Sequence, residues 1–350
     1  MSPGIYIGTV AVASPPYHVT QAQADAFLSA HCSGRLSPRN LTLMHRIFAH
    51  PSISQRSFAF EDPACLIKED PDARIARFTH WSVELSTQAV RKALDQAGLQ
   101  ATDVSGLVVN TCTGYICPGI STYLIETLGL SREVRAYDLV GSGCGGAIPN
   151  LQVAGSQVQG TDGIVLSVSV EICSATFQTG NDLSLIISNA LFADGASAAV
   201  VWRRPSGFEL VASSTFFVPE ERDHIRYVHK NGHLHNQIST HLPHIIKKTA
   251  SKVVSAILSP RSLRTGDIQH WAIHPGGEKV IQEIKKELGL SETQLRPTRD
   301  ILSKYGNMSS PTVWFVLREI MDSGVEKGEW CMMVAFGAGL SAHAFLLRKT

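Results

Sequence analysis

The segment AYDLVGSGCGGA (136–147) has a counterpart roughly 160 residues further along the chain, TRDILSKYGNMSSP (298–311). Each of the two follows a helical pattern that ends in the letters LGLS. Each such pattern follows a short apolar run, GLVVNTCTG (106–114) in the first half and HWAIHPGG (270–277) in the second. Self-similarity at a fixed offset indicates a duplicated structural unit. We therefore predict that each half contains a strand, a loop, a helix, a second strand and a glycine-containing turn.

Continuous apolar runs alternate with helical patterns over the rest of the chain. The runs GIVLSVSV (163–170), ASAAVVW (196–202) and WCMMVAF (330–336) are typical of strands that are buried on both faces. Residues 85–99 and 244–258 carry apolar side chains at the spacing of amphipathic helices. This alternation predicts an α/β layered fold with helices shared between two sheets.

The composition is that of a globular protein without a strong charge bias. The 350 residues are 44% hydrophobic, enough for one large core or two ordinary ones. We place the two halves at roughly 1–200 and 201–350 and, because no linker separates them, expect one compact body. With 31 basic and 30 acidic residues, the formal charge of +1 gives no general affinity for nucleic acid or anionic membranes.

The sequence also shows no sign of export or of metal binding. No apolar run reaches the length of a membrane span, and the N-terminus does not resemble a signal peptide, so we expect a cytoplasmic enzyme. The seven cysteines are scattered and form no CxxC pair. The segment HKNGHLHNQISTHLPH (229–244) is rich in histidine, but its spacings match no helix face or known zinc site. We expect no metal.

Polar residues stand at matching positions of the two halves. Cys144 in GSGCGG falls opposite Asn307 in YGNMSS, and Cys112 falls opposite His274 in AIHPGG. In layered α/β folds, ligands bind beyond the carboxyl ends of the strands. We therefore expect Cys144, His274 and Asn307 to share one site.

These three residue types are suited to nucleophilic catalysis. A free thiol has a pKa of about 8.5 and needs activation. A helix that begins after Cys144, with Pro149 in its first turn, would bring partial positive charge to the sulfur, and His274 could accept the proton. Asn307 could donate to an oxyanion. We expect the glycines beside Cys144 to let a substrate approach. The alternatives are a packed turn for Cys144, a strand-end position for His274 and an Asx-turn or cap for Asn307.

Several motifs together resemble one family. GCGG around Cys144, AIHPGG with His274, YGNMSSPTV with Asn307, LFADGASAAV (191–200) and FGAGLSAHAFLLR (336–348) are similar to segments of the type III polyketide synthases, the chalcone and stilbene synthase family of the thiolase fold. The resemblance runs from about residue 80 to the end. It implies a homodimeric cytosolic enzyme whose substrates are CoA thioesters and which needs no other cofactor.

The resemblance also implies a reaction. An acyl-CoA starter would load its acyl group onto Cys144. His274 and Asn307 would promote decarboxylation of malonyl-CoA to an enolate, which attacks the bound thioester in a Claisen condensation. His274 would also help to keep Cys144 as a thiolate.

Other residues are assigned by the same resemblance. Phe192 matches a phenylalanine that guards the passage between the CoA tunnel and the cavity. The second gatekeeping position, aromatic in the family, falls nearest to Asn236, after the segment NGHL (231–234). CoA phosphates need local cations, for which Arg46 and Arg56 are the candidates, and of these Arg46 resembles a family tunnel position.

The remaining assignments concern the cavity wall and the dimer. Cys112 and Thr113, in NTCTGYICPG (110–119), would face the pocket, and Ser309 matches a cavity serine. Cys117 would lie near the dimer partner.

Two sister activities of the same fold are alternatives. A ketoacyl-ACP synthase III-like condensing enzyme or a CoA-dependent acyltransferase would also use Cys, His and Asn, but usually in HQAN-like and GNT-like motifs. HPGG and GNMSSP favour the polyketide synthase. The starter, the number of malonyl units and the mode of cyclisation, to a pyrone, a resorcinol or a phloroglucinol, stay open.

Overall fold

The computed structural model describes residues 4–230 and 232–350 and has a nine-stranded mixed sheet at its centre. The strand order is β11-β12-β13-β8-β1-β7-β6-β4-β5. At the middle, β1 and β8 pair through only two residue pairs, Tyr6 with Glu209 and Ile7 with Phe208. The sheet thus has an N-terminal part from β1 to β5 and a C-terminal part from β8 to β11. The strands are β1 (Tyr6–Ala13), β4 (Val104–Asn110), β5 (Arg135–Leu139), β6 (Ile164–Ile172), β7 (Asp194–Trp202), β8 (Phe208–Phe217), β11 (His270–Ile273), β12 (Trp330–Gly337) and β13 (Ser341–Lys349).

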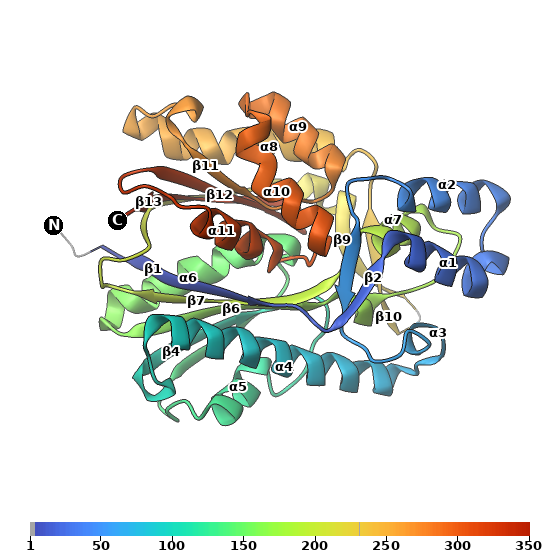
Figure 1. Cartoon of the computed structure of the whole chain (residues 1–350), viewed down its shortest axis with the longest axis horizontal. Coiled ribbons are helices and arrows are strands. Elements are labelled where there is room, and N and C mark those ends of the chain that lie inside the picture. Colours follow the sequence, from blue (N-terminus) through green and yellow to red (C-terminus); the bar gives the residue numbers. More distant parts are fainter. Residues whose placement is uncertain (1–3, 231) are drawn as a thin grey trace.

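Helices cover the outer faces of both sheet parts and fill the space between them (Figure 1). The middle layer holds α6 (Ala147–Thr161) and α11 (Thr312–Asp322). The outer layers consist of α4 (Pro71–Ala97) with α5 (Ile120–Leu128), and of α8 (Leu242–Leu258) with α9 (Glu278–Leu288). The layer order α/β/α/β/α confirms the predicted thiolase-like fold, including helices shared between the sheets.

The middle layer is buried because both of its faces meet a sheet. Trp314 and Val313 of α11 and Leu151 of α6 are fully buried in one cluster with residues of β1, β7, β12 and β13. The predicted apolar runs form β6, β7 and β12, which are buried along almost their whole length. These strands give the central sheet its apolar core on both faces.

The duplication is less exact than the letters indicate. The predicted second strand of the first half is β5, but in the second half the corresponding residues belong to helix α10 (Glu292–Tyr305). A capping box of Ser291 and Gln294 begins that helix. The prediction of a strand in this segment was wrong because its apolar residues have helical spacing. Those buried on the inner face of α10 are Leu295, Ile301 and Leu302. Asn307 therefore follows a helix.

Shorter elements close one end of the molecule, at the right of Figure 1. Strands β2 and β3 pair with each other, as do β9 and β10. The elements at this end are β2 (Tyr17–Thr20), α1 (Gln21–Cys32), α2 (Pro38–Phe48), β3 (Gln55–Phe58), α3 (Cys65–Lys68), α7 (Leu183–Leu191), β9 (Ile225–Lys230) and β10 (His233–Ile238). This end contains the cavity described below.

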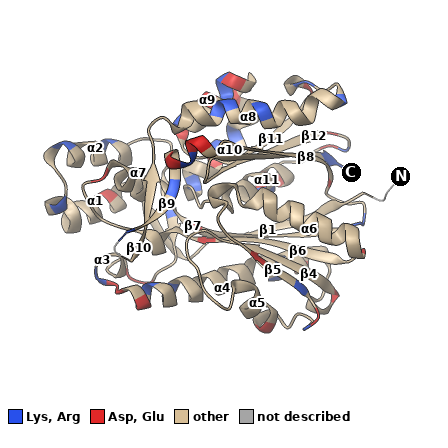
Figure 2. Cartoon of the chain, turned by 180° about the vertical axis from the view of Figure 1, so that it is seen from behind, with Lys and Arg blue, Asp and Glu red and all other residues tan. Residues whose placement is uncertain are grey.

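Charged residues of both signs are mixed along the outer helices (Figure 2). On α8 and α9, Lys247 pairs with Glu283 at 2.9 Å, and Lys285 of α9 pairs with Glu292 at 2.6 Å. Within residues 4–230 and 232–350, no helix is both long and apolar enough to cross a membrane.

Candidate active site

Cys144 lies in a turn of 3₁₀-helix, Gly143–Gly145, between β5 and α6. Its exposed fraction is 8%. Helix α6 begins at Ala147, directly after this turn, and Pro149 occupies its first turn as predicted. The sulfur is therefore attached at the amino end of a helix, where the backbone carries partial positive charge.

Three glycines let two parts of the chain meet at this turn. A Cβ on Gly145 would lie 3.0 Å from Gly337 Cα at the end of β12 and 2.9 Å from Cδ2 of His343. A Cβ on Gly143 would lie 3.0 Å from Ala338 Cβ. Protein atoms occupy this space, so the expectation that these glycines admit the substrate is wrong. Their role is to let β12 pack against the nucleophile turn.

The surroundings of Cys144 keep its thiol protonated. Burial raises the pKa of Cys144 to about 12. A hydrogen bond with the hydroxyl of Ser309 acts in the opposite direction, and the nearby Glu171 carboxyl raises the pKa further. A reactive thiolate therefore needs a partner that offsets the cost of burying its charge.

Glu171 is a functional candidate that the sequence reasoning missed. It ends the apolar run of β6 and is fully buried. Its carboxyl accepts from the backbone N–H of Cys112 at 2.9 Å and of Thr113 at 3.1 Å, and from the hydroxyls of Thr113 at 2.9 Å and Ser310 at 2.8 Å. Burial raises the pKa of this carboxyl, whereas these donors lower it. The signal in the sequence was one acidic residue directly after the uncharged apolar run 163–170.

Ser309 connects the nucleophile to the other predicted cavity residues. Its φ of 58° is in the left-handed region, which is uncommon for a serine. Its hydroxyl is 3.5 Å from Cys112 Sγ and 3.4 Å from a Glu171 oxygen, and it also lowers the pKa of the Cys144 thiol. The structure therefore brings Cys112, Ser309 and Cys144 together, with Thr113 in the same network.

Asn307 is held next to Phe192 by the backbone. Its N–H donates to the carbonyl of Leu191 at 3.0 Å, and its carbonyl accepts from Ala193 N–H at 2.9 Å. The side-chain oxygen accepts from Ser309 N–H at 2.8 Å, which is the Asx-turn considered as an alternative. That turn uses the oxygen and leaves the amide N–H₂ group available as a donor.

His274 follows β11 and has an exposed fraction of 1%. The backbone N–H of His274 donates to the carbonyl of Val334 in β12 at 2.8 Å. Neither ring nitrogen has a hydrogen-bond partner in the part of the chain that the structure describes. Burial lowers the pKa of the imidazole to about 3, so the ring is neutral by itself.

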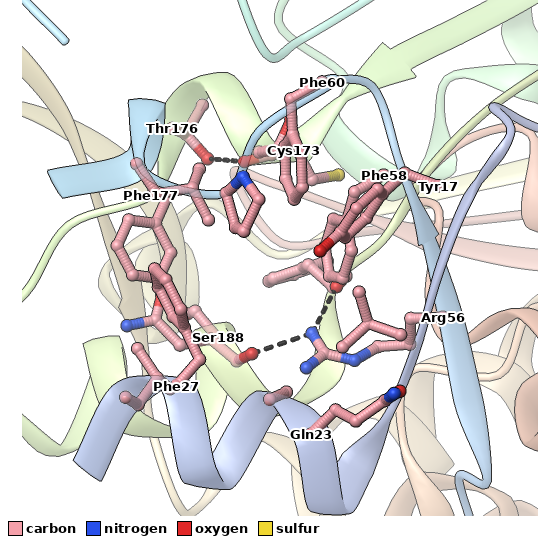
Figure 3. A pocket seen from close by; sticks show the side chains of 18 of the residues that line it. Tyr17, Gln23, Phe27, Arg56, Phe58, Phe60, Cys173, Thr176, Phe177 and Ser188 are labelled. Carbon is pink, nitrogen blue, oxygen red and sulfur yellow. Dashed lines mark hydrogen bonds between the residues drawn. The ribbon is translucent and has the colours of Figure 1, made fainter. Parts of the chain in front are cut away.

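A cavity of about 250 Å³ is lined by Phe192 and by residues of α1, among them Phe27 (Figure 3). Asn236 of β10, with an exposed fraction of 6%, lines it together with Phe192. The predicted gatekeeping pair therefore borders one space. Asn231, in the segment NGHL, lies outside the described residues. Cys117 is exposed and lines no part of this cavity.

The two candidate CoA-binding arginines differ sharply. Arg46 is exposed on α2. Arg56 has an exposed fraction of 2%, and its guanidinium donates to the carbonyls of Asn189 and Phe192, both at 2.7 Å, and to Gln21 at 2.9 Å. The assignment of Arg56 to CoA phosphates is therefore corrected. Arg56 holds the backbone that carries Phe192.

No metal centre is found among the described residues, since 4–230 and 232–350 contain no group of three His, Cys, Asp or Glu side chains that could hold an ion. In the histidine-rich segment, His235 Nε2 lies 3.2 Å from Asp182. That histidine has an ordinary polar partner.

Comparison with known families identifies the class of protein. The model described as FAE1/type III polyketide synthase-like protein matches residues 4–215, and the model described as chalcone and stilbene synthases, C-terminal domain, matches residues 209–350. The first match covers more than half of the chain. The chain therefore belongs to the type III polyketide synthase family, and it is an acyl-CoA condensing transferase.

Individual relatives agree with the family match. The 3,5-dihydroxyphenylacetyl-CoA synthase of Streptomyces toyocaensis is 27% identical over 317 residues, which are 86% of this chain and 81% of that protein. The protein with the same description in Amycolatopsis balhimycina is 29% identical over 276 residues, 76% of this chain and 74% of its own. The crystal structure of PKS-I from the brown alga Ectocarpus siliculosus has a TM-score of 0.92 and 28% identity, covering 100% of this chain and 99% of that one. The resemblance stated from the motifs is confirmed.

The packing at the nucleophile turn gives a first prediction. Gly145→Ala is expected to lower the free energy of unfolding by about 1–3 kcal/mol, because the new methyl group overlaps Gly337 and His343. The same overlap should change the alkylation rate of Cys144, measured by mass spectrometry beside urea unfolding. Gly160→Ala, at an exposed position near the end of α6 with no atom in its way, is the control and should gain about 0.5–1 kcal/mol. Equal stability of the two variants would contradict this account.

Proposed function

We propose that this polyketide synthase carries its starter acyl group on Cys144 and extends it with malonyl units through His274 and Asn307. The observation that carries the proposal is the network around Ser309. The Ser309 hydroxyl lowers the pKa of Cys144, and the N–H of Ser309 donates to the side-chain oxygen of Asn307. His274 is bonded through its backbone to β12, whose end lies against Gly145, and both of its ring nitrogens are without a partner among the described residues. A nucleophile, a proton acceptor and a neutral donor are therefore available in one region of the fold.

Loading is a thioester exchange. The sulfur of Cys144 attacks the carbonyl carbon of the acyl-CoA, a new C–S bond forms, and the bond to CoA sulfur breaks. His274 accepts the thiol proton and passes it to the departing CoA thiolate. Support comes from the unpartnered imidazole, because no other residue among those described competes for its nitrogens.

Extension needs an enolate at the same place. Malonyl-CoA loses CO₂, and the electron pair of that bond becomes an enolate whose charge lies on the thioester oxygen. A neutral His274 and the free amide N–H₂ of Asn307 are suited to donate to this oxygen. The enolate carbon then attacks the acyl carbon on Cys144, forming a C–C bond and releasing the thiolate.

The two halves and the surrounding residues divide this work. Residues 1–200 supply the nucleophile, and 201–350 supply His274 and Asn307. Arg46 is the exposed cation that we assign to the CoA phosphates. Phe192 and Asn236 separate the CoA side from the cavity, and their shared lining of one space supports this. Cys112 and Thr113 form the wall beside Glu171.

For the product we propose a pyrone or a phenolic ring. The similarity to proteins described as 3,5-dihydroxyphenylacetyl-CoA synthases, 27% and 29% identical to this chain, supports the phenolic outcome. We also propose a cytoplasmic location, which the seven unpaired cysteines support.

We further propose a homodimer formed through β5. This strand ends the central sheet, and its second edge has no partner strand within the described chain. Large apolar side chains are exposed on it and beside it, Tyr137 at 50%, Val140 at 60% and Tyr115 at 74%, with Cys117 on the same loop as Tyr115. A second copy would cover both the unpaired edge and this surface.

The nucleophile assignment predicts the outcome of one substitution. Cys144→Ala is expected to abolish acyl loading and to lower condensation by roughly 10³-fold or more, since the reaction loses its covalent carrier. Mass spectrometry of the protein and of the products, with malonyl-CoA and a panel of acyl-CoA starters, measures both. Cys65→Ala is the control and should load normally. Full activity of Cys144→Ala would refute the proposal, and loading without extension in the unmodified enzyme would indicate an acyltransferase.

The role of His274 predicts a change in pH dependence. Burial, the largest cause, raises the pKa of Cys144 to about 12, so we infer that a thiolate at neutral pH requires His274 as proton acceptor. His274→Gln is expected to move the midpoint of the alkylation profile of Cys144 to higher pH, toward that value, and to slow alkylation at pH 7 by at least about tenfold. His45→Gln, an exposed histidine of α2, should leave the profile unchanged. Identical profiles in all three proteins would exclude His274 as the acceptor.

If the dimer forms through β5, one charged side chain on this strand should dissociate it into monomers. Tyr137→Lys places an ammonium group on the β5 edge and is expected to give monomers in sedimentation velocity at micromolar concentrations. Tyr137→Phe keeps the ring and should stay dimeric. A monomeric wild-type protein would refute the dimer, and a Tyr137→Lys variant that stays dimeric would place the interface elsewhere.

A further inference from the structure

A chain of buried polar side chains runs from helix α6 to the turn that carries Asn307. Its members are at most 4% exposed, and in order they are Ser167, Asn150, Asn110, Ser310 and Glu171. Ser310 comes from the C-terminal half, and the others come from the N-terminal half. Buried amides and hydroxyls that lack a partner are costly, so the bonds of this chain are specific. They fasten the two halves together beside the nucleophile.

The sheet fixes the orientation of the Asn150 amide, in the first turn of α6. Its Nδ2 donates to the backbone carbonyls of Val108 at 3.1 Å and Val168 at 2.8 Å. Its Oδ1 accepts from the hydroxyl of Ser167 at 2.6 Å. A carbonyl can only accept, so the N–H₂ group of Asn150 must face β4 and β6. The start of α6 is thereby held on these two strands.

Asn110, the last residue of β4, continues the chain in one direction. Its Oδ1 accepts from Asn150 Nδ2 at 2.9 Å and from the Ser169 hydroxyl at 2.7 Å. Because two donors occupy this oxygen, the N–H₂ group faces the other way, where it donates to Oγ of Ser310 at 2.8 Å. The same nitrogen would lie 2.8 Å from a Cβ on Gly146, the residue before α6. Asn110 therefore contacts both the start of α6 and Ser310.

Ser310 connects the chain to a turn with unusual backbone geometry. Its Oγ accepts from Asn110, so its hydroxyl proton is directed to the Glu171 carboxyl, at 2.8 Å. The preceding residue, Ser309, has a φ of 58°, which a serine keeps only where its surroundings hold it. The N–H of Ser309 donates to the side-chain oxygen of Asn307. The position of Ser310 therefore affects where the Asn307 amide stands.

Two separate contacts set the positions of the catalytic groups. The first is β12, which accepts the backbone N–H of His274 and packs against Gly145 beside Cys144. The second is the bond between Asn110 and Ser310, which joins residues 200 positions apart. Among the bonds that tie the turn of Asn307 to the N-terminal half, this one leads to the helix that follows Cys144.

We propose, on the basis of the function proposed above, that Asn110 is a positioning residue for the extension step. Through Ser310 it sets where the Asn307 amide stands relative to the acyl group on Cys144. Loading uses Cys144 and His274, whose spacing is set by β12, so it should not depend on Asn110. In extension, the enolate bound by Asn307 must meet the acyl carbon, and a misplacement of about 1 Å can slow such a step on the order of 10²-fold.

The test compares two rates in one preparation of the enzyme. Asn110→Leu removes the amide at similar size, and Ser310→Ala removes its acceptor. In both variants the ratio of the extension rate to the loading rate should fall at least about tenfold. Rapid-quench mass spectrometry measures acylation of Cys144 by the starter that loads fastest, and then consumption of the acyl-enzyme after addition of malonyl-CoA. Unfolded protein contributes to neither rate, so partial misfolding does not change the ratio.

The double variant and a matched control locate the effect. Asn110→Leu combined with Ser310→Ala should lower the ratio little further than either change alone, because both remove the same bond. Ser169→Ala removes the hydroxyl that donates to the same Asn110, at an equally buried position, but within the N-terminal half. It should keep the wild-type ratio, whatever its effect on urea unfolding. An unchanged ratio in Asn110→Leu and Ser310→Ala, or an equal fall in Ser169→Ala, would overturn the role of Asn110.

The readouts separate this inference from the proposed function. If no starter acylates Cys144 of the wild-type enzyme, or if the acyl-enzyme is never extended, the proposed function has failed. If the wild-type enzyme loads and extends, but Asn110→Leu and Ser310→Ala keep its ratio of rates, only the role of Asn110 has failed.

Discussion

The close approach of β12 to the nucleophile turn is the constraint on which the site depends. At one point of this strand, Val334 accepts the backbone N–H of His274, and at its end Gly337 lies against Gly145. One strand of the C-terminal half thereby sets where the histidine and the cysteine stand. Any side chain at Gly145 or Gly337 would push the two halves apart at the place where they must cooperate.

Burial then decides the charges in this region. The same exclusion of water raises the pKa of Cys144 to about 12 and lowers that of His274 to about 3. Each group is neutral when considered alone, and a thiolate and an imidazolium exist only as a pair. Separate charges in a medium of low dielectric constant are costly, which is why neither group is charged by itself. The site is also suited to an enolate, whose new charge would find donors and no competing water.

The sequence predicted the parts of the site that depend on local pattern. The buried strands, the helices and the turn around Cys144 follow from periodicity and from glycine and proline positions. We predicted that Asn307 follows a strand, but it follows helix α10. Similar amino-acid sequences in the two halves do not require the same pattern of backbone hydrogen bonds.

The site residues that were missed or misassigned depend on contacts distant along the chain. Glu171 takes its donors from residues 112, 113 and 310. Arginine is a residue type that often binds phosphate. The guanidinium of Arg56, however, donates to the side chain of Gln21 and to the carbonyls of Asn189 and Phe192. A surface arginine and a buried one look alike in a sequence, because only the fold supplies the carbonyls that replace water around the guanidinium.

Arg56 also connects the N-terminal segment to the backbone on both sides of the Phe192–Asn307 bridge. Arg56 packs against Gly306, the residue before Asn307, since a Cβ on Gly306 would lie 2.7 Å from the Cγ of Arg56. Its guanidinium also donates to the carbonyl of Phe192. The residues that hold the chemistry in place therefore come partly from the N-terminal segment, which also lines the cavity beside Phe192. The motifs that identify the family lie elsewhere in the chain and contain Cys144, His274 and Asn307. The position of Phe192 therefore depends on a residue that lies outside these motifs.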